Sequence, residues 1–244
     1  MFQQEILQQI QVNIHSSICI RGEKVIYIDP LKIPDEPHDA DLILITHPHF
    51  DHFSPNDIKK LLKEDTVIAV PESMAPIAKL RTGREPLCLK PGQSLTLCGI
   101  PAETVAAYNQ HKPAHRKGSG WLGYVLTLGE TRVYITGDTD DTPESRAVQC
   151  DILLLPVSGI FTMNARQAAA LTNEIRPHTV IPIHYGALLG GRKAPEEFRA
   201  AVSGGIETDI RDTVYNNLMI RQYARILAIA LLCGLIGYII GSFL

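Results

Sequence analysis

The stretch DLILITHPHFDH, residues 41–52, joins an apolar run to a dense group of metal-binding side chains. Its first six residues, DLILIT, contain a continuous apolar run bounded by Asp41 and Thr46, as expected for a strand that is buried on both faces. Its last six residues contain three imidazoles and one carboxylate, which the packing of a core does not require. Imidazole and carboxylate are ligands that Zn²⁺ and similar divalent ions prefer. The candidate metal ligands at this strand end are His47, His49, Asp51 and His52.

The chain on both sides of this stretch alternates predicted strands with predicted helices. Towards the N-terminus, QVNIHSSICI and KVIYID, residues 11–20 and 24–29, are expected to form two strands joined by a short turn. Helix starts are indicated by capping residues or proline at Ser54, Asn164 and Pro195. Further short apolar runs predict strands at residues 66–70, 132–136, 152–155 and 179–183. This alternation predicts an α/β layered domain.

More candidate ligands follow other predicted strands. Asp138 comes after residues 132–136 through a glycine, and His184 directly follows residues 179–183. In open α/β sheets, ligands gather outside the carboxyl ends of strands, so we expect these side chains to approach residues 47–52. A loop further along offers two histidines, His111 and His115, and spacing alone does not choose between them.

Two polar residues are interpreted as parts of the scaffold. His15 lies inside the first predicted strand, and we expect a hydrogen-bonded core histidine there rather than a residue that supports metal ligands. Ser158 lies in the segment PVSGI, outside any G-x-S-x-G context. It is therefore expected to be a loop residue rather than a nucleophile.

Several segments together resemble the metallo-β-lactamase-fold hydrolases. The resemblance is strongest to the branch that includes ascorbate-6-phosphate lactonase-like and N-acylphosphatidylethanolamine phospholipase D-like proteins, and it covers nearly all of residues 10–200. It implies an αββα sandwich, an α/β fold with a one- or two-metal centre at one edge. The segments that carry it are THPHFDHFSP (46–55), YNQHKPAHRKGSGWLGYVL (108–126), VYITGDTDDTPE (133–144), DILLLPVSGIFTMNARQAA (151–169) and PIHYG (182–186).

The resemblance also implies a role for each candidate ligand. One metal is expected on His47 and His49 together with a third histidine, for which His115 is preferred and His111 is the alternative. A second metal is expected on the remaining histidines and one carboxylate, with another carboxylate bridging both metals. The second set consists of Asp51, His52 and His184, and the bridging residue is Asp138.

The activity implied is metal-dependent hydrolysis. A metal-activated hydroxide is expected to attack an ester, lactone or phosphodiester bond of a small-molecule or lipid-like substrate. Asp51 is expected to orient the nucleophile or to return a proton to the leaving group. The cofactor is expected to be two Zn²⁺ ions, and Mn²⁺ or Fe²⁺ also fits because every candidate ligand is a nitrogen or oxygen donor.

Composition limits the alternatives. The chain has 244 residues, 45% hydrophobic and 20% charged, which is typical of a globular protein with one sizeable core. Its formal net charge of −3 gives no reason to expect nucleic acid as a partner, so a nuclease of the same fold is a weaker alternative. Five scattered cysteines without a CxxC pair argue against a disulfide framework. A redox diiron site is disfavoured because such a site is associated with a carboxylate-rich set of ligands, and residue 49 is a histidine rather than Asp or Glu. The alternative from another class is a non-catalytic metal-binding scaffold at the membrane.

The C-terminus predicts a membrane anchor. Residues 226–244 (ILAIALLCGLIGYIIGSFL) contain no charged residue, and a helix of this length rises about 28 Å, close to the thickness of the hydrocarbon core. Arg221 and Arg225 precede the run, so the positive-inside rule places the preceding domain in the cytoplasm. The glycines at 237 and 241 have a GxxxG spacing that is compatible with a homodimer.

The predicted organisation therefore has three parts. They are a metallo-β-lactamase-like hydrolase domain at residues 1–212, a juxtamembrane connector at 213–225 and a transmembrane helix that anchors the tail at 226–244.

Overall fold

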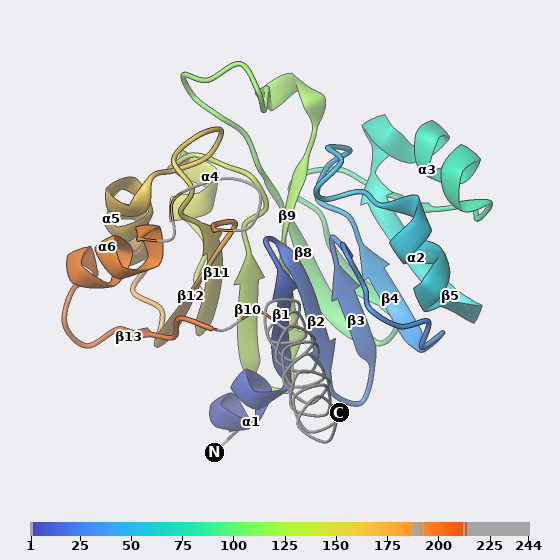
Figure 1. The fold of residues 1–244 in the computed structure, drawn as a ribbon, viewed down its shortest axis with the longest axis horizontal. Helices are drawn as coiled ribbons and strands as arrows, with labels where there is room; N and C mark the ends of the chain where they lie inside the picture. Colours follow the sequence, from blue (N-terminus) through green and yellow to red (C-terminus); the bar gives the residue numbers. More distant parts are fainter. Residues whose placement is uncertain (1, 187–190, 192, 212, 214–244) are drawn as a thin grey trace, which may run out of the picture.

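The computed structural model describes residues 2–186, 191, 193–211 and 213, and it shows two β-sheets that face each other between outer helices (Figure 1). In both sheets, strands that are neighbours in the chain are also neighbours in space. The first sheet consists of β1 (Ile10–Ile14), β2 (Ser17–Arg21), β3 (Val25–Ile28), β4 (Ala40–Leu44), β5 (Leu62–Pro71) and β6 (Leu87–Leu89). The second consists of β7 (Ser94–Leu97), β8 (Ile100–Ala106), β9 (Leu122–Leu128), β10 (Thr131–Ile135), β11 (Ile152–Pro156), β12 (Thr179–Ile183) and β13 (Glu207–Thr208).

Each sheet combines antiparallel hairpins with a run of parallel strands. Strands β3 to β6 pair in parallel in the first sheet, and β10 to β13 do so in the second. Parallel neighbours need crossover connections, and helices supply most of them. The helices are α1 (Phe2–Gln9), α2 (Pro55–Leu61), α3 (Ala75–Thr82), α4 (Pro143–Arg146), α5 (Ala165–Ile175) and α6 (Ala194–Ala201), with short 3₁₀ turns at Glu72–Met74 and Lys117–Ser119.

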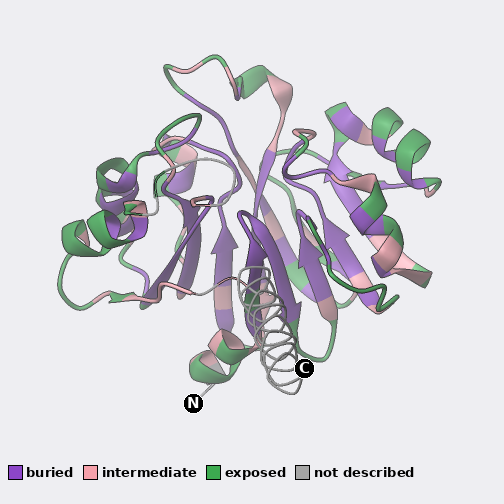
Figure 2. Cartoon of the chain, in the orientation of Figure 1, coloured by how far each residue is buried: buried purple, intermediate pink, exposed green. Residues whose placement is uncertain are grey.

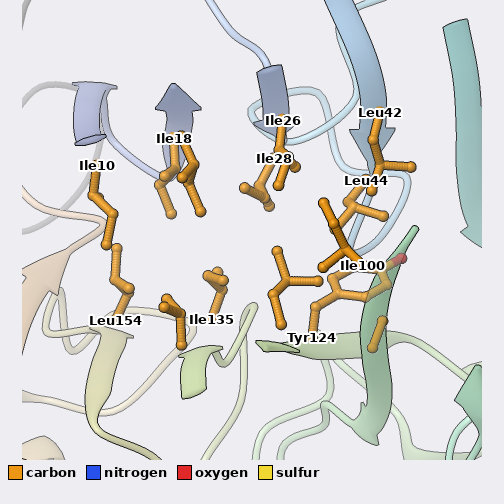
Figure 3. Close-up of a cluster of buried hydrophobic side chains, with 14 of the residues drawn as sticks. Ile10, Ile18, Ile26, Ile28, Leu42, Leu44, Ile100, Tyr124, Ile135 and Leu154 are labelled. Carbon is orange, nitrogen blue, oxygen red and sulfur yellow. The ribbon is translucent and has the colours of Figure 1, made fainter. Parts of the chain in front are cut away.

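The main core lies between the two sheets. Figure 3 shows apolar side chains of the first sheet facing those of the second across this space. The Tyr124 hydroxyl of β9 also donates a hydrogen bond to the Ile45 carbonyl oxygen just beyond β4, at 2.6 Å. The facing residues include Ile10, Ile18, Ile26, Ile28, Leu42 and Leu44 from one side and Ile100, Tyr124, Ile135 and Leu154 from the other.

Two further apolar clusters attach the outer helices. Ile58 and Leu61 of α2 pack with Ile43 on the outer face of the first sheet. Leu171 of α5 and Phe198 of α6 pack on the outer face of the second sheet. Figure 2 shows the result, with buried strands in the middle and helices that turn exposed faces outward. The predicted αββα sandwich is confirmed.

The predicted helix starts are also confirmed. The Ser54 hydroxyl accepts a hydrogen bond from the Asp57 backbone N–H at the start of α2. At the start of α5, Asn164 and Gln167 form a reciprocal capping box. Pro195 lies in the first turn of α6.

One predicted strand is wrong. Residues 11–20 do not form a single strand, because the chain reverses at His15 and Ser16 and continues as the antiparallel pair β1 and β2. His15 has a left-handed backbone, with φ at 57°. Left-handed turns are typical of Gly or Asn, and neither residue is at the turn itself. The sequence therefore gives no local signal of the reversal.

The predicted membrane anchor is a second correction. Crossing a bilayer takes about 20 apolar helical residues. The longest helix in the described part of the chain is α5, with 11 residues, and none of the helices described combines the length and apolar character of a membrane span. The predicted span, residues 226–244, and residues 214–225 before it lie outside the described residues. The prediction of a transmembrane tail anchor, with the cytoplasmic placement derived from it, is corrected accordingly.

Candidate metal centre

The seven candidate ligands come from four connections and meet in one place. Residues 47–52 follow β4, and His115 belongs to the connection between β8 and β9. Asp138 follows β10 and His184 follows β12. Segments distant in the sequence thus supply one cluster, as strand ends at a common edge are expected to do. His111, the alternative third histidine, is exposed, whereas His115 is buried.

One group of ligands surrounds Asp51. Its Oδ2 atom lies 3.6 Å from His52 Nε2 and 3.5 Å from His184 Nε2. Potential ligand atoms of these three residues and of His15 all lie within 4.8 Å of one another, and all four residues are buried. This group matches the ligands expected for the second metal, with His15 as an addition.

A second group consists of His47, His49 and His115. His47 Nε2 lies 3.0 Å from His49 Nδ1, and the His115 ring centroid is 5.0 Å from both other ring centroids. The three residues offer ligand atoms within 4.8 Å of one another. Trp121 packs beside all three rings, with centroid distances of 5.0–5.4 Å. These are the histidines expected for the first metal.

Asp138 lies between the two groups. Its Oδ1 atom is 3.4 Å from His52 Nε2. Its Oδ2 atom is 3.3 Å from His115 Nε2 and 3.2 Å from His184 Nε2. A carboxylate in contact with both groups has the position that a bridging ligand requires.

The backbone before Asp138 needs glycine. Gly137 has φ at 63°, and a Cβ atom there would approach the Leu122 carbonyl oxygen to 2.8 Å and Thr46 Cβ to 3.2 Å. A larger residue would therefore be strained and would push the Asp138 connection away from residues 46–47. The Gly-Asp pair places the carboxylate beside the histidines.

Four imidazoles are held in place through the same ring nitrogen. Nδ1 of His52 lies 2.7 Å from Asp29 Oδ2, and Nδ1 of His47 lies 2.9 Å from Thr46 Oγ1. The other two rings contact Asn109 and Ser158, and assigning Nδ1 as the donor in all four contacts satisfies each oxygen. In each ring, Nε2 is then left as an electron-pair donor, which is the form that binds a metal. The Nδ1 contacts of His115 to Asn109 Oδ1 and of His184 to Ser158 Oγ measure 2.8 and 3.2 Å.

Several inward-facing atoms of the cluster have no hydrogen-bond partner. Buried polar atoms without partners are costly, and a group of electron-pair donors around one point is stabilised by a cation. The donor set therefore fits divalent metal ions. The atoms concerned are His52 Nε2, His115 Nε2, His184 Nε2 and Asp138 Oδ1.

The electrostatics of the cluster favour positive charge at its centre. Burial disfavours ionised Asp138, but His184 and His52 outweigh it and hold the pKa of the carboxyl well below its usual value. Burial also opposes charge on Asp51, and a hydrogen bond from His15 contributes to holding its pKa below the usual range. Burial lowers the pKa of His47, so this imidazole stays neutral. Burial also opposes charge on His52 and His184, but Asp138 outweighs it and holds the pKa of both imidazoles above the usual value. A metal ion that binds there would take the place of a proton on each of these two rings, beside carboxylates that are already anionic.

Sequence reasoning missed the residues around the ligands. His15, expected to be a core histidine, contacts Asp51 through Nε2 at 3.1 Å. Ser158, expected to be a loop residue, supports His184. Asp29 and Asn109 also contact ligand rings, and neither was a candidate. Asp29 ends the predicted strand KVIYID, so the strand-end rule that found Asp138 would also have found it.

The comparison with known proteins agrees with this geometry. A family model described as a Beta-lactamase superfamily domain matches residues 9–184. The chain belongs to this superfamily. A relative in Thermoplasma acidophilum, a UPF0173 metal-dependent hydrolase, is 30% identical over 199 residues, which are 76% of this chain and 87% of the relative.

Solved structures of the superfamily fold extend the comparison. A crystal structure from Parabacteroides distasonis, described as a putative metal-dependent hydrolase, is 32% identical, with a TM-score of 0.70 over 84% of this chain and 92% of the other. CmlA, a diiron β-hydroxylase from Streptomyces venezuelae, has a TM-score of 0.71 at 13% identity over 84% of this chain and 52% of CmlA, and this likeness shows the fold alone. The present superfamily member is thus a metal-dependent hydrolase, as the sequence predicted.

Proposed function

We propose that the chain hydrolyses an ester, lactone or phosphodiester bond with two divalent metal ions. His47, His49 and His115 would hold one ion, Asp51, His52 and His184 the other, and Asp138 would bridge them. The observation that carries the proposal is the set of buried Nε2 and carboxylate atoms without hydrogen-bond partners, which face one another across the cluster.

The bound ions would lower the pKa of a water molecule toward neutrality and polarise the carbonyl or phosphoryl oxygen of the substrate. The chain's own part is to fix its donors before the substrate arrives. Asp29, Asn109 and Ser158 each hold one ring nitrogen, so the opposite nitrogen of each ring is aimed inward. No serine or cysteine nucleophile is required.

Asp51 would orient the attacking water. Its carboxylate is anionic because nearby imidazoles hold its pKa below the usual range despite burial. An anionic carboxylate accepts hydrogen bonds and carries no proton to give to a leaving group. Of the two roles expected from the sequence, orientation of the nucleophile is therefore the better supported.

The surroundings of the cluster support a substrate with an apolar portion. Phe50 lies between His49 and Asp51 in the chain and is 73% exposed. Ile160 and Phe161 are also exposed, in the loop that carries Ser158. The lysine of the neighbouring loop, Lys112, is already paired with Asp140 and donates to the Thr162 carbonyl oxygen. These features favour a small-molecule or lipid-like substrate that carries an apolar group.

Zinc is the first metal to test, because the proposed ligands are mainly imidazoles. Mn²⁺ and Fe²⁺ accept the same nitrogen and oxygen donors. CmlA, with the same fold, is described as a diiron enzyme, which supports including iron in the test.

The test is elemental analysis of the purified full-length chain after loading with Zn²⁺, Mn²⁺ or Fe²⁺, followed by assays on aryl esters, lactones and bis-aryl phosphodiesters. We expect about two ions per chain and metal-dependent turnover. Asp138→Ala removes the proposed bridge, so it should lower turnover by more than about 100-fold, since losing a support of a ligand already costs 10–100-fold.

Asp140→Ala is the matched control, because Asp140 lies two residues away and pairs with Lys112 rather than with the cluster. It should retain both ions and most of the activity. A folded wild-type chain that takes up no ion, or one that binds two ions yet turns over none of the three substrate classes, would count against the proposed hydrolysis. The second result would favour a metal-binding scaffold.

A further inference from the structure

His15 is a buried histidine at an unusual backbone position. It is 2% exposed and lies at the reversal between β1 and β2, with φ at 57°. Side chains other than Gly and Asn rarely adopt this conformation. Its Nδ1 atom is buried without a hydrogen-bond partner. Neither the backbone strain nor the unpartnered nitrogen favours the folded state, so packing alone does not account for an imidazole here.

The closest contacts of His15 go to two proposed ligands of one metal, and its ring also lies edge-on to the ring of the third, His52, with the centroids 6.3 Å apart. Its Nε2 atom lies 3.1 Å from Asp51 Oδ2. Its backbone carbonyl oxygen accepts a hydrogen bond from the His184 backbone N–H at 3.0 Å. Its ring centroid is 3.7 Å from the centroid of the His184 ring. One residue of the first sheet therefore touches a ligand from its own sheet and a ligand from the other sheet.

These contacts restrict the two ligands in different ways. The Nε2–H group would fix the rotation of the Asp51 carboxylate, because the ring nitrogens of His184 and His52 lie further from its Oδ2 atom, at 3.5 and 3.6 Å. The carbonyl oxygen fixes the backbone of His184, which itself has a left-handed φ of 60°. Ligands that are held in the binding geometry before the ion arrives bind it more tightly.

We propose that His15 is a positioning residue for the second metal, which orients Asp51 by donating from Nε2 and holds His184 against its ring and carbonyl oxygen. The inference rests on the two-metal centre of the proposed function. It predicts that loss of His15 weakens binding of the second metal alone, because none of these contacts reaches His47, His49 or His115.

The experiment compares His15→Leu with His15→Gln in the full-length chain. Leucine fills the space without a donor, and the glutamine Nε2 lies about as far along the side chain as the imidazole Nε2. Both variants keep the same backbone strain. The control is His38→Leu, because His38 is another histidine with positive φ, at 47°, whose side chain is 53% exposed.

The readouts do not depend on turnover. Stepwise Zn²⁺ affinities are measured by competition with a chromophoric chelator, and the visible absorption of the Co²⁺-loaded chain reports the ligands of each ion. We expect His15→Leu to weaken one of the two binding steps by 10–100-fold and to leave the other within about threefold. His15→Gln should restore most of the loss, and its Co²⁺ spectrum should match that of the wild type.

The other outcomes tell apart a failure of the positioning role of His15 and a failure of the two-metal centre. Two unchanged affinities in His15→Leu would overturn the positioning role and leave the two-metal centre standing. Equal loss of both ions with a lowered unfolding temperature, absent in His38→Leu, would show a structural role instead. A Co²⁺ spectrum that changes in His15→Gln without rescue would make His15 itself a ligand. A wild-type chain that binds no ion would overturn both proposals.

Discussion

Single side chains set the chemistry of the centre through their hydrogen bonds. An imidazole has two nitrogens, and the one that binds a metal is chosen by the partner of the other. Asp29 makes this choice for His52, and Asn109 makes it for His115. Replacing such a partner would leave the ligand in the sequence while removing its orientation. A list of ligands is therefore an incomplete description of this site.

The clustering of the candidate ligands was predictable from the sequence, whereas most of their hydrogen-bond partners were not. His47 to His52 stand out because four donors fall within six residues. Asn109 has no such local signal, since its contact with His115 depends on the path of the connection between β8 and β9. Asp29 reaches His52 and Thr46 because β3 and β4 are parallel neighbours. Pairing between strands is a property of the folded chain.

The reactivity of single cysteines tests how tightly the side chains around them are packed. Burial raises the pKa of Cys19 to about 11 and that of Cys150 to about 12. A thiol with a pKa of 11 is about 0.1% thiolate at pH 8, and thiolate is the reactive form. We expect exposed Cys88 to be alkylated by iodoacetamide at pH 8 well before Cys19 and Cys150 in the native protein.

Peptide mapping by mass spectrometry over a time course measures the three rates. Denatured protein is the control, since all three thiols should then react alike. Rapid alkylation of Cys19 in the native state would contradict the packing of the first sheet against its outer cluster.

Among the helices, α5 begins with a capping box formed by Asn164 and Gln167. Asn164 Oδ1 accepts a hydrogen bond from the Gln167 backbone N–H, and Gln167 Oε1 accepts one from the Asn164 backbone N–H. Asn164→Ala should lower the free energy of unfolding by about 1 kcal/mol, because the helix loses its cap. Urea denaturation measures this change.

Arg166→Ala on the same helix is the matched control, since Arg166 is exposed, and it should change stability by less than about 0.5 kcal/mol. Equal effects of the two substitutions would argue against a stabilising cap. A loss much above 2 kcal/mol would mean that Asn164 also supports the loop before α5, where it pairs with Ser158 in an isolated β-bridge.

The elements that the sequence predicted share one property. Strands β4, β10, β11 and β12 are buried on both faces or nearly so, and they appear as continuous apolar runs. Strands β6, β7 and β8 were not predicted. Each of them has exposed or half-buried residues beside buried ones, and β8 contains Pro101 and Glu103, so no apolar run marks them. They lie at sheet edges or next to them.

For the whole molecule, a bound ion should act as a cross-link between the sheets. The proposed ligands are divided between connections of the first sheet and connections of the second. An ion that binds only the folded state stabilises it by about 4 kcal/mol when its free concentration is about 1,000 times its Kd. For a chain of this size, that corresponds to a rise of roughly 8–16 °C in the unfolding temperature.

Differential scanning fluorimetry of the full-length chain, with and without a chelator, measures the shift. Chelation should lower the unfolding temperature of the wild type, and the shift should shrink in Asp138→Ala. An unfolding temperature that changes neither with Zn²⁺ nor with the chelator would contradict a metal site whose ligands come from both sheets.

The division of the chain between the two sheets also sets an order of events during synthesis. Residues up to 89 build the first sheet, and His184 lies beyond β12 in the second. A ribosome that adds about 5–20 residues per second takes roughly 7–26 s to pass from His52 to His184. During that interval the nascent chain displays four donors of the HPHFDH segment without the rest of their centre. Loading of the proposed centre would therefore be a late step in synthesis, because the donors at 47, 49 and 52 are made well before His184 is added to the chain.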